Sequence, residues 1–336
     1  MATTTRILRR QAIGLESTRG TGVAATHRLF GMTKLNLDQP VAPIPEEWGS
    51  LSAVRRTIQG LKSGNATFAG TLNFEDMPFW GGMALKYLSA PSTASSGSAP
   101  NKTANIWNFT GDETVDTLRT ATFEWTDATQ SWQAPFCICN SLQFGMSLGG
   151  PVTVNAGFLM PNRATTTETV LALAATRTPL LGAKSTVYLD DATIGTTQLT
   201  GTVTDWSVGV NNNITPLYFC DGSQVWSDVE RGPREISASV TMRMGSTALT
   251  EITKWAAATT RQLEIRLVGP ILDAANYSAV SETVKFQLAG PWTAAVIGES
   301  GNTVTVQFAL VPAYDSTLAS NIKLIYSGTV GNLTGL

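Results

Sequence analysis

Alternation of apolar and polar residues is the dominant pattern along the chain, and it predicts a mainly β protein. Apolar side chains recur at every second position in many short segments, which is typical of strands with one buried face. Gly, Pro and Asn residues separate these segments, as in turns and loops. The predicted strands are residues 26–37, 66–74, 120–126, 136–148, 152–160, 185–190, 199–210, 235–244, 261–268, 284–289 and 303–311.

Two segments change from the strand period to a helical one. Residues 64–85, GNATFAGTLNFEDMPFWGGMAL, begin as a strand and continue into a helix predicted over 76–88. Glu75 and Asp76 stand where carboxylates can cap the first helical turn. A second helix is predicted over 246–258, directly after a strand.

The order strand, long loop, strand, helix occurs twice, and this predicts an internal duplication. The long loops are residues 38–64 and 211–233. Leu35 and Leu37 before the first loop match Trp206 and Val208 before the second, and the second helix is expected to pack through Leu249, Ile252 and Ala256. We therefore expect duplicated β-barrel or β-sandwich halves, each with a short flanking α-helix.

This duplication predicts the domain organisation. Residues 1–160 are expected to form the first half with an N-terminal arm, residues 161–184 a linker, and residues 185–336 the second half with a C-terminal arm.

The composition favours a protein whose surface is covered by neighbours. Charged residues make up 14% of the chain and hydrophobic ones 43%, so much of the surface is neutral and polar. A net charge of −2 gives no positive field to attract nucleic acid. The run VLALAA at 170–175 is too short to span a membrane, so we expect a soluble protein made in a cytoplasm.

The residues that carry most enzyme chemistry are scarce. His27 is the one histidine, and Cys137, Cys139 and Cys220 are the three cysteines, too few for a typical catalytic or zinc arrangement. We expect no catalytic residue, no bound cofactor and no metal, with the cysteines as reduced thiols. Asp190 and Asp191 are expected in a β-turn, with a calcium site there as the alternative.

Five stretches, in this order and over both halves, carry a family resemblance. They are residues 14–37, 64–85, 106–125, 185–210 and 216–242. On these stretches the chain resembles the tail tube (major tail) proteins of long, non-contractile bacteriophage tails, those of siphoviruses. The resemblance implies a β-barrel or β-sandwich flanked by a helix, in rings that stack into a hollow tube through which the genome passes.

The resemblance also implies a function and partners. The protein is expected to be a structural virion protein, not an enzyme, made in the host bacterial cytoplasm and located in the virion tail. Its partners would be copies of itself, a tape-measure protein and tail-tip or terminator proteins. Double-stranded DNA would pass through the lumen during genome ejection without sequence-specific binding, and no membrane is involved.

Two halves per chain predict trimeric rings with pseudo-sixfold symmetry, and hexameric rings are the alternative. Trp48 and Trp226 lie in the two long loops and are the candidate contacts with the next ring, unless they pack on their own domain. A β-rich adhesion or receptor-binding protein of the virion is the second functional interpretation. A hydrolase of cell-wall glycans is the third.

Overall fold

Strands make up most of the computed structural model, so the prediction of a mainly β protein is confirmed. The structure describes residues 10–44, 56–87, 92–94, 104–111, 119–126, 130–171, 177–273 and 277–328. The strands are β1 (Arg10–Leu15), β2 (His27–Arg28), β3 (Met32–Asp38), β4 (Val41–Pro43), β5 (Thr57–Gln59), β6 (Ser63–Thr71), β7 (Lys86–Tyr87), β8 (Ser92–Ala94), β9 (Ala104–Thr110), β10 (Thr120–Thr126), β11 (Ser131–Met146), β12 (Thr153–Met160), β13 (Ala164–Thr166), β14 (Ser185–Asp190), β15 (Val203–Asn211), β16 (Ile214–Leu217), β17 (Asp228–Arg231), β18 (Glu235–Arg243), β19 (Thr260–Asp273), β20 (Tyr277–Ser300), β21 (Thr303–Leu310) and β22 (Ile322–Gly328). The helices are α1 (Met77–Ala84) and α2 (Ser246–Ala256), and single 3-10 turns are η2 (Phe74–Asp76) and η3 (Gly182–Lys184).

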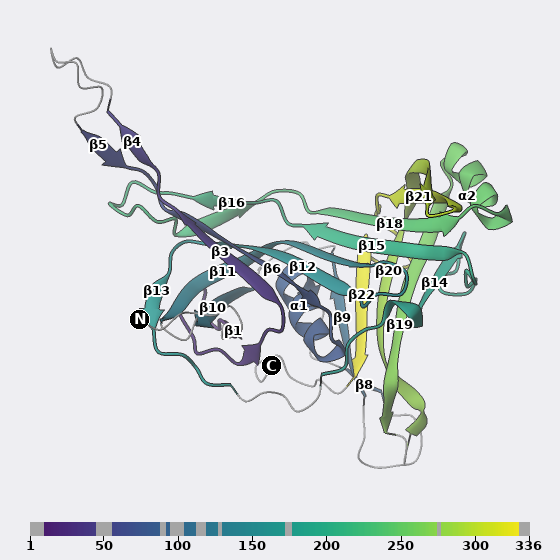
Figure 1. Ribbon diagram of the computed structural model, residues 1–336, viewed down its shortest axis with the longest axis horizontal. Helices are drawn as coiled ribbons and strands as arrows, with labels where there is room; N and C mark the ends of the chain where they lie inside the picture. Colours follow the sequence, from purple (N-terminus) through teal and green to yellow (C-terminus); the bar gives the residue numbers. More distant parts are fainter. Residues whose placement is uncertain are drawn as a thin grey trace.

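One long antiparallel sheet extends through most of the molecule (Figure 1). Its strands follow the order β3, β6, β12, β11, β15, β18, β21 and the last part of β20. Buried residues alternate with exposed or half-buried ones along β6, β12, β15 and β18. One face of this long sheet therefore lies on the core, and we call the other its open face.

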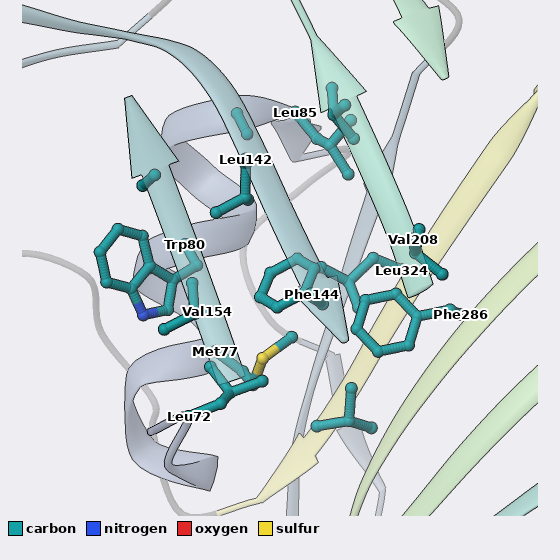
Figure 2. Packing of buried hydrophobic residues seen from close by; sticks show 14 of the residues in the cluster. Leu72, Met77, Trp80, Leu85, Leu142, Phe144, Val154, Val208, Phe286 and Leu324 are labelled. Atoms are coloured by element: carbon teal, nitrogen blue, oxygen red, sulfur yellow. The ribbon is translucent and has the colours of Figure 1, made fainter. Parts of the chain in front are cut away.

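A second sheet covers part of the core-facing side. We call it the cover sheet, and its order is β14, β19, the first part of β20, β22 and β9. Phe286 of the cover sheet packs on Phe144 and Trp206 of the long sheet, with ring centroids 5.1 and 5.9 Å away, and Figure 2 shows Phe144 beside Phe286. The architecture is thus an open sandwich and not a closed barrel.

Helix α1 lies inside this sandwich, and all eight of its residues are buried. The Trp80 ring contacts the rings of Phe68 and Phe158 on the long sheet, at 5.0 and 6.4 Å between centroids. Figure 2 shows Trp80 beneath the strands of this sheet. A Cβ atom added to Gly81 would lie 2.7 Å from the Phe109 ring, so the helix packs directly on β9.

The acidic pair before α1 does not cap the helix, so that prediction is wrong. The α1 N-terminus has no capping hydrogen bond from the Asp76 side chain. Asp76 instead accepts a hydrogen bond from Asn73 at 2.8 Å and another from Arg177, while Glu75 accepts the backbone N–H of Thr178 at 3.1 Å. Both carboxylates hold a distant segment of the chain against η2.

Helix α2 packs on the core through Ile252, a half-buried residue that was predicted to do so, and through two residues that were not predicted. Its buried residues are Ala248 and Glu251, whereas Leu249 is 56% exposed and Ala256 is exposed. The Glu251 carboxylate turns inward because Arg261 donates to it from β19 at 2.9 Å and Trp292 from β20 at 2.9 Å. A buried ion pair therefore takes the place of the apolar contacts expected from Leu249 and Ala256 and adds to that of Ile252.

The same strand pairings occur twice along the chain. In the first run β1 pairs with β10, β10 with β11, β11 with β12, β12 with β6, and β6 with β3. In the second run β14 pairs with β19, β19 with β20, β20 with β21, β21 with β18, and β18 with β15. A bulge follows Cys139 of β11 in the first run and Trp292 of β20 in the second.

Candidate functional site

The open face of the long sheet is polar but nearly uncharged in its middle strands. Its side chains include those of Ser141 and Gln143 on β11, Asn155 on β12, and Ser237 and Ser239 on β18, on the side opposite the buried residues of these strands. Hydroxyl and amide groups satisfy one another across strands, as where the Ser207 and Ser239 hydroxyls lie 2.8 Å apart. A face of this kind can meet water or a polar polymer without holding it by charge.

This face is hollowed into an open groove of about 650 Å³. The groove crosses six neighbouring strands, from β3 to β18, and Lys34 and Glu235 are the charged residues among those that line it. Since their formal charges are opposite, the side chains that line the groove carry no net charge to attract an anionic ligand.

Two hairpins extend from one end of the long sheet, and α2 lies at the opposite end (Figure 1). Strands β4 and β5 form the first hairpin, and β16 and β17 form the second. The base of the first hairpin touches the loop between β16 and β17, where the Lys62 backbone N–H donates to the Gln224 carbonyl oxygen at 2.7 Å. Apolar side chains on this end are exposed to 57% at Val41, 58% at Ile58 and 52% at Phe219.

Of the two tryptophans predicted as contacts, one in each long loop, the structure describes Trp226. Trp226 is 2% exposed and packs on Phe136, with ring centroids 4.9 Å apart, beside Ile138 and Ile214. Its indole therefore holds the loop between β16 and β17 against its own chain. Trp48 lies outside the described residues, and contact with another chain stays a prediction for both tryptophans.

The acidic pair of residues 190 and 191 is divided between two networks. Asp190 accepts hydrogen bonds from the backbone N–H groups of Thr196 and Thr197 at 3.0 and 2.8 Å. Burial opposes its charge, but these donors outweigh burial and hold the pKa of Asp190 below its usual value. The hydrogen bond from Lys254 at 2.8 Å lowers the pKa of Asp191, so both carboxylates have protein partners.

The candidate reactive side chains are built into the core. His27 is 2% exposed, stacks on Phe79 at 5.3 Å between centroids, and has its Nε2 atom 3.0 Å from Asp76. Cys137 and Cys139 are fully buried, and burial raises the pKa of both thiols, to about 12 for Cys139. Over the described residues no group of three His, Cys, Asp or Glu side chains could hold a metal ion.

Together the open sandwich, its neutral groove and the buried reactive groups define a structural β protein. A sequence model of the family described as "Phage tail tube protein" matches residues 8–312. The chain belongs to this family, which makes it a structural protein of the phage tail and not an enzyme. No curated protein matches the chain.

Membership of this family indicates where the protein is located and that it associates with copies of itself. A tail tube protein assembles with its own copies into a tube in the virion tail. In the described part of the chain, neither helix has the length and apolar character that crossing a bilayer requires.

Proposed function

We propose that the protein polymerises into stacked rings and forms the hollow tail tube through which the phage DNA passes. The observation that carries this proposal is one long sheet with a concave, neutral open face between two edges, at β3 and at the end of β20, that pair with no further strand in the described part of the chain. Strand edges of this kind pair readily with another chain, and repeated head-to-tail pairing closes a ring.

Negative-stain microscopy of the purified protein tests the proposal against its alternatives. Rings or tubes are expected. Spikes would favour the adhesion or receptor-binding interpretation, and a protein that stays monomeric at all concentrations would contradict both.

Within the ring we propose two similar halves per chain, with residues 161–184 linking residues 1–160 to residues 185–336. The repeated order of strand pairing supports this division. Three chains would then supply six sandwiches in a pseudo-sixfold ring.

The width of the long sheet bears on the number of chains. If its eight strands all faced the lumen, three chains would give a ring about 37 Å across between backbones, before strand tilt widens it. Six chains would double that diameter. Helical reconstruction of tubes decides between them: six copies per ring with the halves at different radii would refute the trimer.

The open face is the proposed lining of the lumen. Its neutral hydroxyl and amide groups would let DNA slide, because phosphate contacts from Lys and Arg are what hold DNA to proteins. Tubes carrying Gln143→Lys should retain DNA in a mobility-shift assay, whereas tubes carrying the matched Gln198→Lys, on an exposed turn outside the groove, should not. Equal retention of DNA by both variants would contradict the proposal that the open face lines the lumen.

The two hairpins are the proposed contacts with the next ring. A two-stranded ribbon with exposed apolar residues on it is weakly stable by itself, and Val41 and Ile58 are such residues. Deletion of residues 44–58, which removes Trp48, is expected to stop stacking while single rings still form. Normal tubes from the deletion variant would contradict this assignment.

The remaining proposed partners are those of a siphovirus tail. A tape-measure protein would occupy the lumen before DNA enters, and tail-tip and terminator proteins would bind the two ends of the tube. The chain would be made in the host bacterial cytoplasm.

A further inference from the structure

The long sheet contains a junction where the two runs of strands meet inside one chain. Phe144 of β11 lies opposite Val208 of β15, and Leu142 lies opposite Val210. Phe144 is 2% exposed and Val208 is 1% exposed, since both side chains face the core. This junction shows how an edge of the first run and an edge of the second fit together.

The end of β20 is the counterpart, in the second run of strands, of the β11 segment that forms the junction in the first run. Both strands carry a bulge, after Cys139 in β11 and after Trp292 in β20, and each then pairs with the next strand in the chain. Aligning the two bulges places Ala295 at the position of Leu142 and Ile297 at the position of Phe144.

Strand β3 corresponds in the same way to β15. If the cross-strand partners are followed from Cys139 across β12 and β6, the partner reached on β3 is Leu35. From Trp292, the counterpart of Cys139, the cross-strand partners on β21 and β18 end at Val208 of β15. Leu35 therefore holds the position of Val208, and Leu37 holds that of Val210.

Both counterparts of the junction strands have an open edge. Strand β3 pairs along one edge with β6, and residues 292–300 pair with β21, while the other edge of each meets no strand within the described ranges. Ile297 is 63% exposed where its counterpart Phe144 is 2% exposed, and Val296 beside it is 59% exposed. The apolar position that Phe144 holds at the junction is thus uncovered at the β20 edge, while Leu35 and Leu37 at the β3 edge are half-buried.

We propose that β3 of one chain pairs with the end of β20 of a second copy, in the antiparallel register of the junction. Ile297 then lies opposite Leu35 and Ala295 opposite Leu37 on the core-facing side, while Val296 lies opposite Asn36 on the open face. The proposal rests on the proposed function, since it names the contact by which one chain joins the next in a ring.

The two edges are too far apart to pair within one chain. Six strands lie between them in the long sheet, and seven spacings between neighbouring strands add up to roughly 34 Å. A second copy supplies the missing strand at each edge without any change in the fold, because the chain already contains the same junction.

Disulfide cross-linking of assembled tubes tests the register. Asn36→Cys and Val296→Cys are combined in one chain with Cys220→Ser, since Cys220 is the exposed native thiol. Mild oxidation is expected to link these chains into dimers and larger species on non-reducing gels. The matched control replaces Asn36→Cys by Met32→Cys, an exposed position on the same face of β3 but four residues away, about 13 Å, and it should not link.

The possible outcomes separate this inference from the proposed function. Tubes that form but link through residue 32, or through neither pair, overturn the register while leaving the tube intact. Absence of rings and tubes from the wild-type protein contradicts the proposed function itself.

A second variant keeps the test valid if the cysteines disturb assembly. Ile297→Lys places a charge at the proposed contact, and edge lysines block strand pairing. The variant should lose sedimentable tubes and keep the thermal midpoint of the wild-type monomer. Val170→Lys, at a 78% exposed valine outside the sheets, should assemble normally, and tubes from Ile297→Lys would refute the proposed contact.

Discussion

The ion pair beneath α2 offers a sharp test of what holds this helix on the sandwich. Arg261 donates to the Glu251 carboxylate through two nitrogens, at 2.9 and 3.0 Å, and Trp292 donates to it at 2.9 Å. Glu251 and Arg261 are each 3% exposed. One carboxylate thus connects the helix to two strands, and Glu251→Ala would remove all three hydrogen bonds.

The expected loss follows from the charge that is left behind. Removing one member of a buried ion pair typically costs about 3–5 kcal/mol of the free energy of unfolding. Arg261 keeps the Asp191 carboxylate and the Leu189 carbonyl oxygen as acceptors, so we expect about 3 kcal/mol for Glu251→Ala. Combining Glu251→Gln with Arg261→Met removes both charges and retains an acceptor for Trp292, which should restore stability to within about 1 kcal/mol of wild type.

Urea unfolding of the monomer, followed by tryptophan fluorescence, measures these differences. Lys254→Ala is the control on the same helix: its ion pair with Asp191 is partly exposed, so the loss should be below about 1 kcal/mol. A loss for Glu251→Ala no larger than that of this control, or a double variant as unstable as the single one, would contradict the stabilising role of the ion pair.

Three further predictions concern the core and its titratable groups. Trp80→Ala should lower the free energy of unfolding by about 3–5 kcal/mol, whereas Trp255→Ala, at a residue 37% exposed, should cost about 1 kcal/mol or less; urea unfolding compares them, and equal losses would contradict the buried placement of α1. Because the folded-state pKa of Asp190 is lowered, its contribution is present above the usual value of 3.8 and is lost as the pH falls through the folded pKa. The stability difference between wild type and Asp190→Asn should therefore be constant above about pH 5 and shrink in acid, and a difference that does not change with pH would refute this. A thiol reagent at neutral pH should titrate Cys220 in the folded protein and all three cysteines after denaturation; fast reaction of the buried thiols would contradict their burial and raised pKa.

Local patterns predicted many strands but missed those whose pairing is distant. Strands β10 and β14 match their predicted ranges, because each alternating run ends at turn residues. Strand β22 was not predicted, although buried and half-buried residues alternate along all of it. Only the middle of β20 was predicted, since Gly290 and Pro291 interrupt the pattern where the strand passes from the cover sheet to the long sheet.

The predicted duplication paired the right strands in the wrong register. Leu35 and Leu37 were matched to Trp206 and Val208, whereas the cross-strand partners place Leu35 at the position of Val208. An alternating pattern fits itself equally well after a shift of two residues. Pairing with neighbouring strands fixes the register, and one sequence does not contain that information in any local window.

The buried polar contacts could not be predicted from local sequence patterns for a related reason. Asp76 and Arg177 are 101 positions apart, and Glu251 and Trp292 are 41 apart. The local rules for helix starts assigned Glu75 and Asp76 to capping because nothing nearby competes for them. The fold brings donors from distant segments to these carboxylates, and such donors bind more strongly in the core than at a solvated helix end.

The structure shows which surface of this weakly charged chain is neutral. Composition gives 14% charged residues but does not say which surface is neutral. The groove of the open face has Lys34 and Glu235 as its charged lining residues, while Lys254 of α2 pairs with Asp191 outside the groove. A face that served only to be covered by another subunit would be more apolar at its centre. Hydroxyl and amide side chains on a concave sheet instead suit a surface that stays wetted, and this favours the lumen over a subunit interface for the open face.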